Sequence, residues 1–329
     1  MNKTITKQIA IMINDKCNLQ CSYCYQNHNR SNKEISLELV NKLINYFKKD
    51  NKYNSIMFYG GETMLSPNIV KKFITELGSQ YHYMIMTNGT IPLNKFSLEL
   101  KEYKNCFTFG FSYDGLNQKN RSLNNLNQIF KNINFLHKNG FAFKIMHVLS
   151  SEALCNLNDN ILFLSNIHPI VKLRRICNLH DCWSEKDKEF FINNISKTTL
   201  LVCYLNNIKN CRISLPNQIQ FKSGTEGIKR HAFYCQNSLA TGSNVIGIDG
   251  KIYPCENRAA NKIENYGLAP DDLNKSIYTP HLNDTIYNIC TMYATVEPKV
   301  DEALEEQRSK YQEYKKKFLN LKNNGRKNK

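Results

Sequence analysis

The sequence has no apolar run long enough to cross a membrane or to serve as the core of a signal peptide. We therefore expect a cytoplasmic protein with no membrane partner. Because disulfides are rare in a reducing cytoplasm, the 12 cysteines are interpreted as metal ligands or reduced core thiols. The 329 residues, of which 41% are hydrophobic, suffice for one large core and a smaller satellite.

A basic stripe interleaved with aromatic residues is also missing. The net charge is +16, from 44 lysines and arginines against 28 acidic residues, and such an excess can indicate nucleic-acid binding. Lysine and asparagine are instead spread along the whole chain, and only residues 315–329 are densely basic. We interpret that block as a helix end and a solvated terminus. Nucleic acid is not the expected partner, and an acidic peptide is the alternative reading of the charge.

Three cysteines in the run Cys17-Asn-Leu-Gln-Cys21-Ser-Tyr-Cys24 carry most of the information in the chain. Three thiolates hold three irons of a four-iron cubane and leave the fourth iron open to bind something else. The alternative is a zinc site. A structural zinc ion needs a fourth ligand that closes a tetrahedron, and His28 is the one nearby candidate.

This C-x3-C-x2-C spacing resembles that of the radical S-adenosylmethionine (SAM) superfamily. The resemblance implies a [4Fe-4S] cluster whose open iron binds the amino and carboxylate groups of SAM. An electron from the cluster, supplied by a donor such as flavodoxin or ferredoxin, then breaks a carbon–sulfur bond. The resulting 5'-deoxyadenosyl radical takes a hydrogen atom from the substrate. In the family an aromatic ring before the third cysteine, here Tyr23, lies near the adenine.

Strand-like and helix-like segments alternate after the cysteines, which predicts parallel β/α units. The expected strands are Gln8–Ile13, Ser55–Tyr59, Tyr83–Met86, Phe107–Ser112, Phe141–Leu149 and Val171–Ile176. An amphipathic helix is expected over Ser36–Lys49, with one face formed by Leu37, Val40, Leu43, Ile44 and Phe47. Ser66 and Pro67 are expected to begin the next helix as its N-cap and first turn. The predicted fold class is α/β, a partial (β/α)6 TIM-like barrel with its strand-end loops gathered on one face.

Polar motifs follow successive strands. Paired glycines in Gly60-Gly61-Glu62 let a backbone approach a ligand closely, and the carboxylate can accept from an ammonium group. In the resembled family this segment holds the SAM amino group. Asn88, Ser112 and Asp114 are similar to family positions that line the SAM ribose and methionine moiety. Arg121 is expected either to pair with the SAM carboxylate or to lie on the surface at a helix start.

The second half departs from a plain barrel. Helical residues near Asp187–Asn206 precede a loop-rich region, and an Asp-Gly turn predicts a hairpin over Val245–Cys255. The pattern Cys235, Gly250, Cys255 resembles the start of SPASM and twitch domains, small C-terminal domains that bind auxiliary iron–sulfur clusters in radical SAM enzymes acting on peptides and proteins. A full SPASM domain would supply several more cysteines. One auxiliary cluster is therefore expected, with Cys290 as third ligand and a fourth ligand left open among Cys203, Cys211, His231 and substrate.

The expected domains are a radical SAM partial barrel over 7–212, a SPASM/twitch-like domain over 213–300, and a C-terminal helix with a basic tail over 301–329. That helix is predicted over Asp301–Leu321, with a stripe that packs on the core formed by Leu304, Tyr311, Tyr314 and Phe318. The remaining cysteines are interpreted as buried or incidental thiols: Cys106, Cys155, Cys177 and Cys182.

The leading functional hypothesis is a maturase that installs a cross-link or a similar modification in a ribosomally made precursor peptide. The runner-up is a sulfatase-maturing-type enzyme, which oxidises Cys or Ser to formylglycine. Its relatives carry a Pro-Cys-Asp step whose carboxylate acts as base, and Pro254-Cys255-Glu256 is similar but one methylene longer. Glu256 is thereby the candidate catalytic residue. A non-catalytic iron–sulfur protein is the third reading, and it would not need Gly60-Gly61-Glu62 or Asn88.

Overall fold

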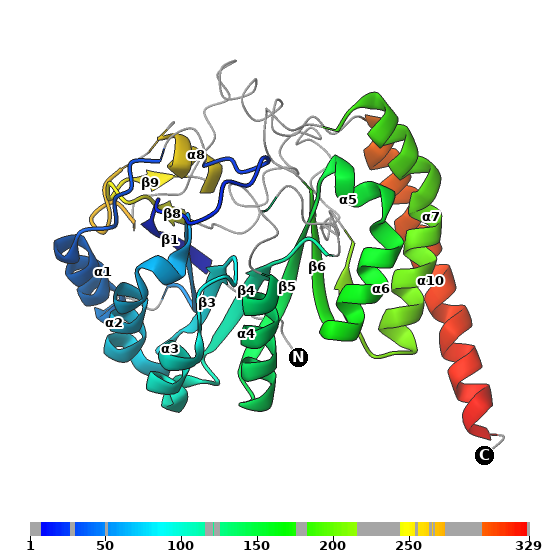
Figure 1. The fold of residues 1–329 in the computed structure, drawn as a ribbon, viewed down its shortest axis with the longest axis horizontal. Helices are drawn as coiled ribbons and strands as arrows, with labels where there is room; N and C mark the ends of the chain where they lie inside the picture. Colours follow the sequence, from blue (N-terminus) through cyan, green and yellow to red (C-terminus); the bar gives the residue numbers. More distant parts are fainter. Residues whose placement is uncertain are drawn as a thin grey trace. The chain divides into compact units, whose positions relative to one another are not determined.

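The computed structural model describes residues 8–26, 30–49, 52–115, 121, 126–175, 183–215, 244–253, 256–262, 265, 267–273 and 298–327. The chain divides into two compact units, whose helices and strands are drawn in Figure 1. The first comprises Met1–Phe111, Arg121–Phe143 and Ser223–Thr291, and the second Ser112–Asn120, Lys144–Lys222 and Met292–Lys329.

The first unit is built on a sheet in the order β4-β3-β2-β1-β8-β9. Its strands are β1 Gln8–Asn14, β2 Ser55–Gly60, β3 His82–Thr87, β4 Phe107–Ser112, β8 Asn244–Ile246 and β9 Ile252–Tyr253. The pairs among β1 to β4 and the β1–β8 pair are parallel, whereas β9 returns antiparallel to β8. Chain segments far apart in the sequence are thus neighbours in one sheet, because Ile9 pairs with Asn244.

Helices follow the strands of this unit, as the alternating pattern predicts. They are α1 Leu37–Lys49, α2 Pro67–Leu77, α3 Asn94–Glu99, α4 Leu126–Lys138 and α8 Glu256–Asn261, with short 3-10 turns at Thr63–Leu65, Gly78–Gln80 and Lys101–Tyr103. One face of the sheet packs against these helices through large rings: Phe58 of β2 lies 5.3 Å from Phe73 of α2 and 6.0 Å from Tyr83 of β3, centroid to centroid. The other face carries a smaller cluster in which Met12, Tyr59 and Tyr253 meet Ala259 of α8.

The second unit contains a parallel sheet in the order β7-β6-β5. Its elements are β5 Ala142–Leu149, α5 Ser151–Cys155, α6 Leu157–Ile167, β6 Ile170–Arg175, α7 Glu185–Asn207, β7 Arg212–Ser214 and α10 Pro298–Lys327. α7 begins with a complete capping box between Ser184 and Asp187. The predicted C-terminal helix is confirmed and is longer than expected. It packs on α7, where Asn206 donates to the Tyr311 hydroxyl at 3.1 Å and the Tyr204 and Phe318 rings lie 5.9 Å apart.

All six expected strands are confirmed, to within a residue at each end over the described residues. Two details of the helices differ from the expectation. Leu37 is the first residue of α1 and is 63% exposed, so the buried stripe begins at Val40 instead. Ser66 precedes α2 as predicted but makes no side-chain cap bond, because its hydroxyl donates to Glu34 Oε2 at 2.8 Å and accepts from Asn14 Nδ2 at 2.9 Å.

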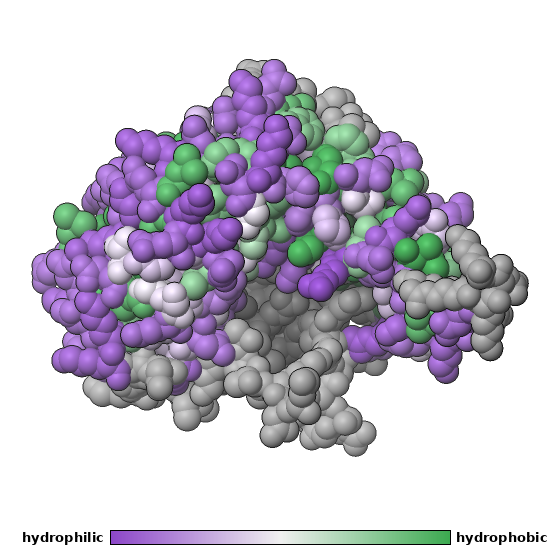
Figure 2. Space-filling view, turned by 90° about the horizontal axis from the view of Figure 1, so that it is seen from below, coloured by the Kyte–Doolittle hydropathy of each residue, from purple (hydrophilic) through white to green (hydrophobic). Residues whose placement is uncertain are grey.

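No helix within the described ranges is long and apolar enough to cross a membrane. On the face drawn in Figure 2, the coloured residues are mostly hydrophilic, and hydrophobic residues form small separate patches.

Candidate functional site

A closed loop after β1 carries the three clustered cysteines. Its two ends are tied together where the chain leaves and returns to the sheet: the Asp15 amide donates to Lys33 O at 3.0 Å and the Ile35 amide to Ile13 O at 2.9 Å. The buried Asp15 carboxylate accepts from the amides of Ser31 at 2.8 Å and Lys33 at 2.7 Å, and from the Ser31 hydroxyl. This carboxylate therefore holds the base of the loop shut.

The loop presents Cys17, Cys21 and Cys24 as free thiols, with Cys21 buried and the other two half-buried. The Cys24 amide donates to Cys21 O at 3.1 Å, and the Leu19 amide donates to Cys17 Sγ at 3.4 Å. Burial raises the pKa of the Cys17 thiol, while the Leu19 amide and the Arg30 charge act in the opposite direction. Among the described residues, no three His, Cys, Asp or Glu side chains converge on one metal ion. A four-iron cubane does not need three ligands on one ion, because each thiolate binds a different iron of the cluster.

Gly60 and Gly61 lie against the start of this loop. A Cβ atom on Gly60 would collide with the Asn14 carbonyl oxygen, and one on Gly61 with the Lys16 carbonyl oxygen. The close approach allowed by the glycines is therefore an approach to the chain's own backbone. It permits Gly61 N to donate to Asn14 O at 3.1 Å and Glu62 N to Lys16 O at 2.6 Å. The segment holds the residue before Cys17 in place.

Glu62 is 1% exposed and lies at the centre of the strand-end network. Its Oε1 accepts from the Met64 amide at 2.9 Å and from the Thr87 hydroxyl at 2.8 Å, and its Oε2 accepts from the Asn88 amide at 2.6 Å. Burial raises the pKa of this carboxyl, and the three donors and the charge of Arg121 oppose that rise. A carboxylate accepts up to about four hydrogen bonds, so Oε2 retains room for a further donor.

Asn88 and Thr90 extend the network toward the cysteines. Asn88 Nδ2 donates to Asn18 Oδ1 at 2.9 Å and lies 3.9 Å from Cys17 Sγ, and Asn18 Nδ2 in turn donates to Thr90 Oγ1 at 2.7 Å. The loop after β3 and the cysteine loop are therefore joined side chain to side chain.

Arg121 is 7% exposed and donates to the Tyr23 hydroxyl at 2.8 Å. The reading of Arg121 as a surface arginine is therefore wrong. Its charge opposes the rise in the pKa of Glu62 that burial causes, so Arg121 lies in the same polar region as Glu62 and Tyr23. Buried acidic, cationic and phenolic groups beside three thiols form a donor set that fits an iron–sulfur cluster and a zwitterionic ligand such as SAM.

Two asparagines were not anticipated from the sequence. Asn132 is 3% exposed, donates to Gly89 O and Ile91 O at 2.8 Å each, and accepts from the Leu93 amide at 3.0 Å. Asn14 is fully buried and donates to Glu62 O at 3.0 Å. The signals that could have found them are a polar residue on the otherwise apolar face of α4 and one at the end of an apolar strand.

Ser112 and Asp114 belong to the second unit. Ser112 ends β4 and is half-buried. Asp114 is 4% exposed; its Oδ1 accepts from the Val148 amide at 2.9 Å and lies 3.8 Å from Nδ1 of the fully buried His147. Both ring nitrogens of His147 lack a hydrogen-bond partner within the described part of the chain. Burial lowers the pKa of His147, although the Asp114 charge acts against this.

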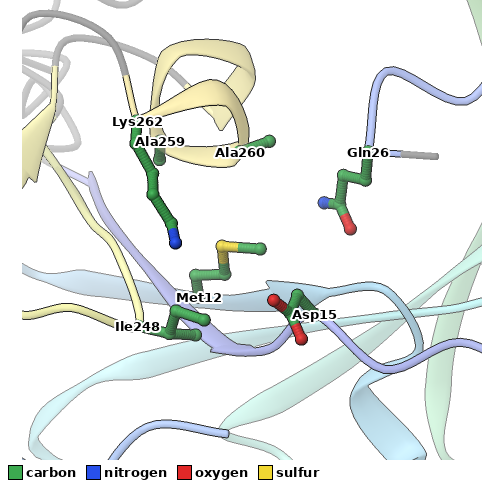
Figure 3. A pocket seen from close by; sticks show the side chains of 7 residues that line it. All are labelled: Met12, Asp15, Gln26, Ile248, Ala259, Ala260 and Lys262. Carbon is green, nitrogen blue, oxygen red and sulfur yellow. The ribbon is translucent and has the colours of Figure 1, made fainter. Parts of the chain in front are cut away.

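The predicted hairpin is confirmed over its described residues, with Val245 paired to Tyr253 and Gly250 in the left-handed region at φ 78°. α8 follows it and begins at the half-buried Glu256. A small cavity of about 10 Å³ lies between α8 and the end of β1. Figure 3 shows the side chains of Asp15, Gln26 and Lys262 among those that line it. The helix that begins at Glu256 therefore lies beside the cysteine loop and the end of β1.

The auxiliary-cluster ligands Cys235, Cys255 and Cys290, and the alternative ligand His231, lie outside the described residues. Cys203 and Cys211 are described and buried in the second unit. Cys203 Sγ lies 3.6 Å from Tyr311 O and accepts from Asn207 Nδ2 at 3.4 Å. Its thiol packs in the α7–α10 contact.

The chain is similar to several known proteins. The family model described as the radical SAM superfamily matches residues 11–153. An uncharacterized protein, MJ0907 of Methanocaldococcus jannaschii, is 28% identical over 170 residues, covering 48% of this chain and 58% of the relative. The radical SAM cyclopropyl synthase TigE of Paramaledivibacter caminithermalis is 25% identical over 214 residues, covering 57% and 44%. The chain thus spans about half the length of these relatives. A cysteine-type anaerobic sulfatase-maturating enzyme of Clostridium novyi is 23% identical, covering 76% and 74%.

Solved structures show the same fold. Native anSMEcpe with bound AdoMet has a TM-score of 0.69 and 17% identity, covering 96% of this chain and 99% of that one. Streptococcus suis SuiB bound to precursor peptide SuiA has a TM-score of 0.61 and 14% identity, covering 86% and 66%. The parallel β/α arrangement is therefore the partial barrel predicted from the sequence. Residues 11–153 thus match the radical SAM superfamily model, and the chain is similar to a radical SAM cyclopropyl synthase and to a sulfatase-maturating enzyme.

Proposed function

We propose that this protein is a radical SAM enzyme that modifies a ribosomally made precursor peptide, installing a cross-link or a similar modification. The observation that carries the proposal is the loop of Cys17, Cys21 and Cys24, closed at its base and joined through Asn88 to the buried Glu62. When bound, a [4Fe-4S] cluster and SAM supply reductive cleavage of SAM, which yields methionine and a radical that takes a hydrogen atom from the substrate.

Each residue of the strand ends has a role in this proposal. The three thiolates bind three irons and leave the fourth iron to SAM. Glu62 Oε2, which accepts one hydrogen bond from the Asn88 amide, also accepts one from the SAM ammonium. Arg121 donates to the SAM carboxylate. The Tyr23 ring, whose hydroxyl is held by Arg121, lies against the adenine. Gly60 and Gly61 act by keeping Asn14 to Lys16 in contact with β2.

Three further residues are assigned by the family resemblance alone. Asn88 is proposed to bind the methionine or ribose part of SAM, and Ser112 and Asp114 are proposed for the same parts of the cofactor. The Asp114 side chain accepts from the Val148 amide and faces His147. Asp114 therefore acts by holding the backbone after β4 in position, and its carboxylate does not contact SAM.

The peptide substrate is supported by the relatives. TigE is named a cyclopropyl synthase, and the solved SuiB structure holds its precursor peptide SuiA. We further propose one auxiliary iron–sulfur cluster held by Cys235, Cys255 and Cys290, in a domain over 213–300 between the barrel over 7–212 and the C-terminal helix over 301–329. Flavodoxin or ferredoxin would supply the electron. Glu256, which follows Cys255 in the sequence and begins α8, is the proposed base.

Formylglycine formation is the second candidate. It is favoured by the extent of the likeness, since the sulfatase-maturating relative aligns over 76% of this chain and anSMEcpe over 96%. Two features distinguish this chain from the sulfatase-maturing enzymes. It has Glu256 where they carry Asp after the cysteine, and it has few cysteines after Cys255.

The test uses the full chain, reconstituted anaerobically with iron and sulfide and reduced with dithionite. Wild type should release deoxyadenosine from SAM, whereas Cys21→Ala should release none. A cubane that lacks one of its three thiolates loses the open-iron geometry. Wild-type release by Cys21→Ala would refute the radical SAM reaction. Cys106→Ala is the matched control, since this half-buried thiol lies outside the cysteine loop, just before β4.

The iron content and the product separate the finer proposals. With two four-iron clusters, the protein should hold about twice the iron of one cubane, and the Cys235→Ala, Cys255→Ala double variant should hold one. With a Cys-containing peptide as probe, formylglycine would appear as loss of sulfur and gain of oxygen. A cross-link in a precursor peptide encoded beside the gene would appear as loss of a hydrogen pair.

A further inference from the structure

Arg30 lies where the cysteine loop returns to the sheet. The residue after it, Ser31, is fixed by the Asp15 carboxylate through both its amide and its hydroxyl. The main chain of Arg30 is therefore anchored at the loop base, although the cysteines themselves are 6 to 13 positions away in the sequence.

The Arg30 guanidinium reaches back to both parts of the loop. Nη1 donates to Leu19 O at 2.8 Å, and Nη2 donates to Cys24 Sγ at 3.5 Å. Leu19 lies between Cys17 and Cys21, and Cys24 is the third ligand position. The donors of a guanidinium form a rigid planar fork. This one group thus contacts the backbone between Cys17 and Cys21 and the side-chain sulfur of Cys24.

Within the described part of the chain, no carboxylate pairs with this guanidinium. Its Nε atom is buried there without a hydrogen-bond partner, and its two Nη atoms donate to a carbonyl oxygen and a sulfur. An arginine keeps its charge at all ordinary pH values. Within those described residues, the guanidinium therefore places a positive charge beside Cys24 Sγ.

We propose that Arg30 is a positioning and electrostatic residue for the cluster: it holds Leu19 and Cys24 together, and its charge makes the cluster easier to reduce. The inference rests on the proposed function, since it assumes that the cysteines hold an iron–sulfur cluster. The reduction potential of such a cluster depends on net charge and on hydrogen bonds to its sulfurs. A cluster that accepts one electron gains one negative charge, and an unneutralised cation beside a ligand sulfur favours that state.

The experiment compares wild type with Arg30→Gln and Arg30→Lys in the full chain, after anaerobic reconstitution. Iron content is measured first, and the cluster is then titrated with dithionite in the absence of SAM and followed by electron paramagnetic resonance. Arg30→Gln should shift the reduction equilibrium about tenfold toward the oxidised cluster, which is about 59 mV for a one-electron couple. Arg30→Lys, which keeps the charge, should shift it by much less.

The matched control is Lys33→Gln. Lys33 is an exposed cation of the same loop, and it contacts Asp15 through its backbone, so glutamine keeps that contact while removing the charge. Its reduction equilibrium should match wild type. A shift in Lys33→Gln as large as in Arg30→Gln would show a general effect of net charge and would overturn the assignment to Arg30.

The remaining outcomes also decide. Full iron and an unchanged potential in Arg30→Gln overturn the inference. Loss of iron in Arg30→Gln but not in Arg30→Lys supports it, because the charge is then needed to hold the cluster. Loss of iron in both variants leaves Arg30 as a structural tie and overturns the electrostatic part. A wild type that binds no cubane would instead refute the proposed function, which separates the two failures.

Discussion

Two buried carboxylates that follow strands, Glu62 in the first unit and Asp114 in the second, have different surroundings. Glu62 accepts three hydrogen bonds from the chain; burial raises its pKa, and the charge of Arg121 opposes that rise. Asp114 accepts from the Val148 amide and faces the buried His147. The first arrangement surrounds the carboxylate with donors from several segments, whereas the second ties neighbouring strand ends together. A buried acid at a strand end is therefore not by itself a cofactor ligand.

The sharpest test of this difference is SAM binding. Glu62→Gln should remove the charge-assisted hydrogen bond proposed for the SAM ammonium, and such bonds contribute about 1.5–3 kcal/mol. At about 1.4 kcal/mol per tenfold change, we expect roughly 10- to 150-fold weaker binding. Asp114→Asn should change the affinity less than about threefold, because its side chain contacts its own chain. Titration calorimetry on variants with equal iron content measures both. Equal losses in the two variants would break the comparison.

A smaller effect is expected from the donor that Thr87 supplies to Glu62. Thr87→Val removes the hydroxyl that donates to Glu62 Oε1 and accepts from the Gly89 amide. Leaving a buried polar group unsatisfied costs about 1–3 kcal/mol, so the free energy of unfolding should fall by about that amount in urea titration.

Thr75→Val on α2 is the control for this change. Thr75 is exposed, and its hydroxyl donates within its own helix. Its effect should stay within about 0.5 kcal/mol, as is usual at the surface. If Thr87→Val were as mild as Thr75→Val, the network around Glu62 would contribute little to stability.

The smallest expected effect concerns pH and the partner of Asp114. Because burial lowers the pKa of His147 in the folded protein, the unfolded chain binds more protons below its histidine pKa of about 6.5. The stability contributed by neutral His147 is thus complete above about pH 6.5 and is lost as the pH falls toward the folded pKa. The slope is at most about 1.4 kcal/mol per pH unit for one group.

His147→Leu should flatten this acid-side loss, as measured by thermal unfolding midpoints between about pH 7.5 and 5.5. His137→Gln, a change at an exposed position of α4, should leave the wild-type pH dependence in place. A pH dependence in His147→Leu equal to that of wild type would show that His147 is not the group that loses stability in acid.

The identity of the strands was readable from local sequence because parallel strands buried on both faces are short apolar runs, and each run here is bounded by turn residues. The cysteine spacing was equally local, since all three cysteines lie within eight consecutive residues. For Gly60-Gly61-Glu62 the sequence predicted a close approach but not the group that approaches. A glycine pair indicates that something approaches closely, but which group approaches depends on the register of β1 against β2.

Arg121 and Arg30 show the limit more clearly. Neither stands at a motif position that indicates burial, and the role of each follows from a contact that the local sequence does not indicate. Arg121 donates to Tyr23, 98 residues away, and Arg30 donates to Cys24 across a closed loop. Such contacts arise from the folding of the loops at the strand ends, where backbone direction and not composition decides which side chains meet.

The sequence by itself determined the alternating β/α pattern, the three thiols and the acidic and glycine residues at the strand ends, because periodicity and ligand spacing are local properties of the chain. The tertiary structure alone decided that Asn14 and Lys16 are the groups lying against the glycines, that Glu62 is buried among three donors while Asp114 faces His147, and that a hairpin from residue 244 onward pairs with β1. These are contacts between distant segments, and only the register and packing of the sheet bring such segments together.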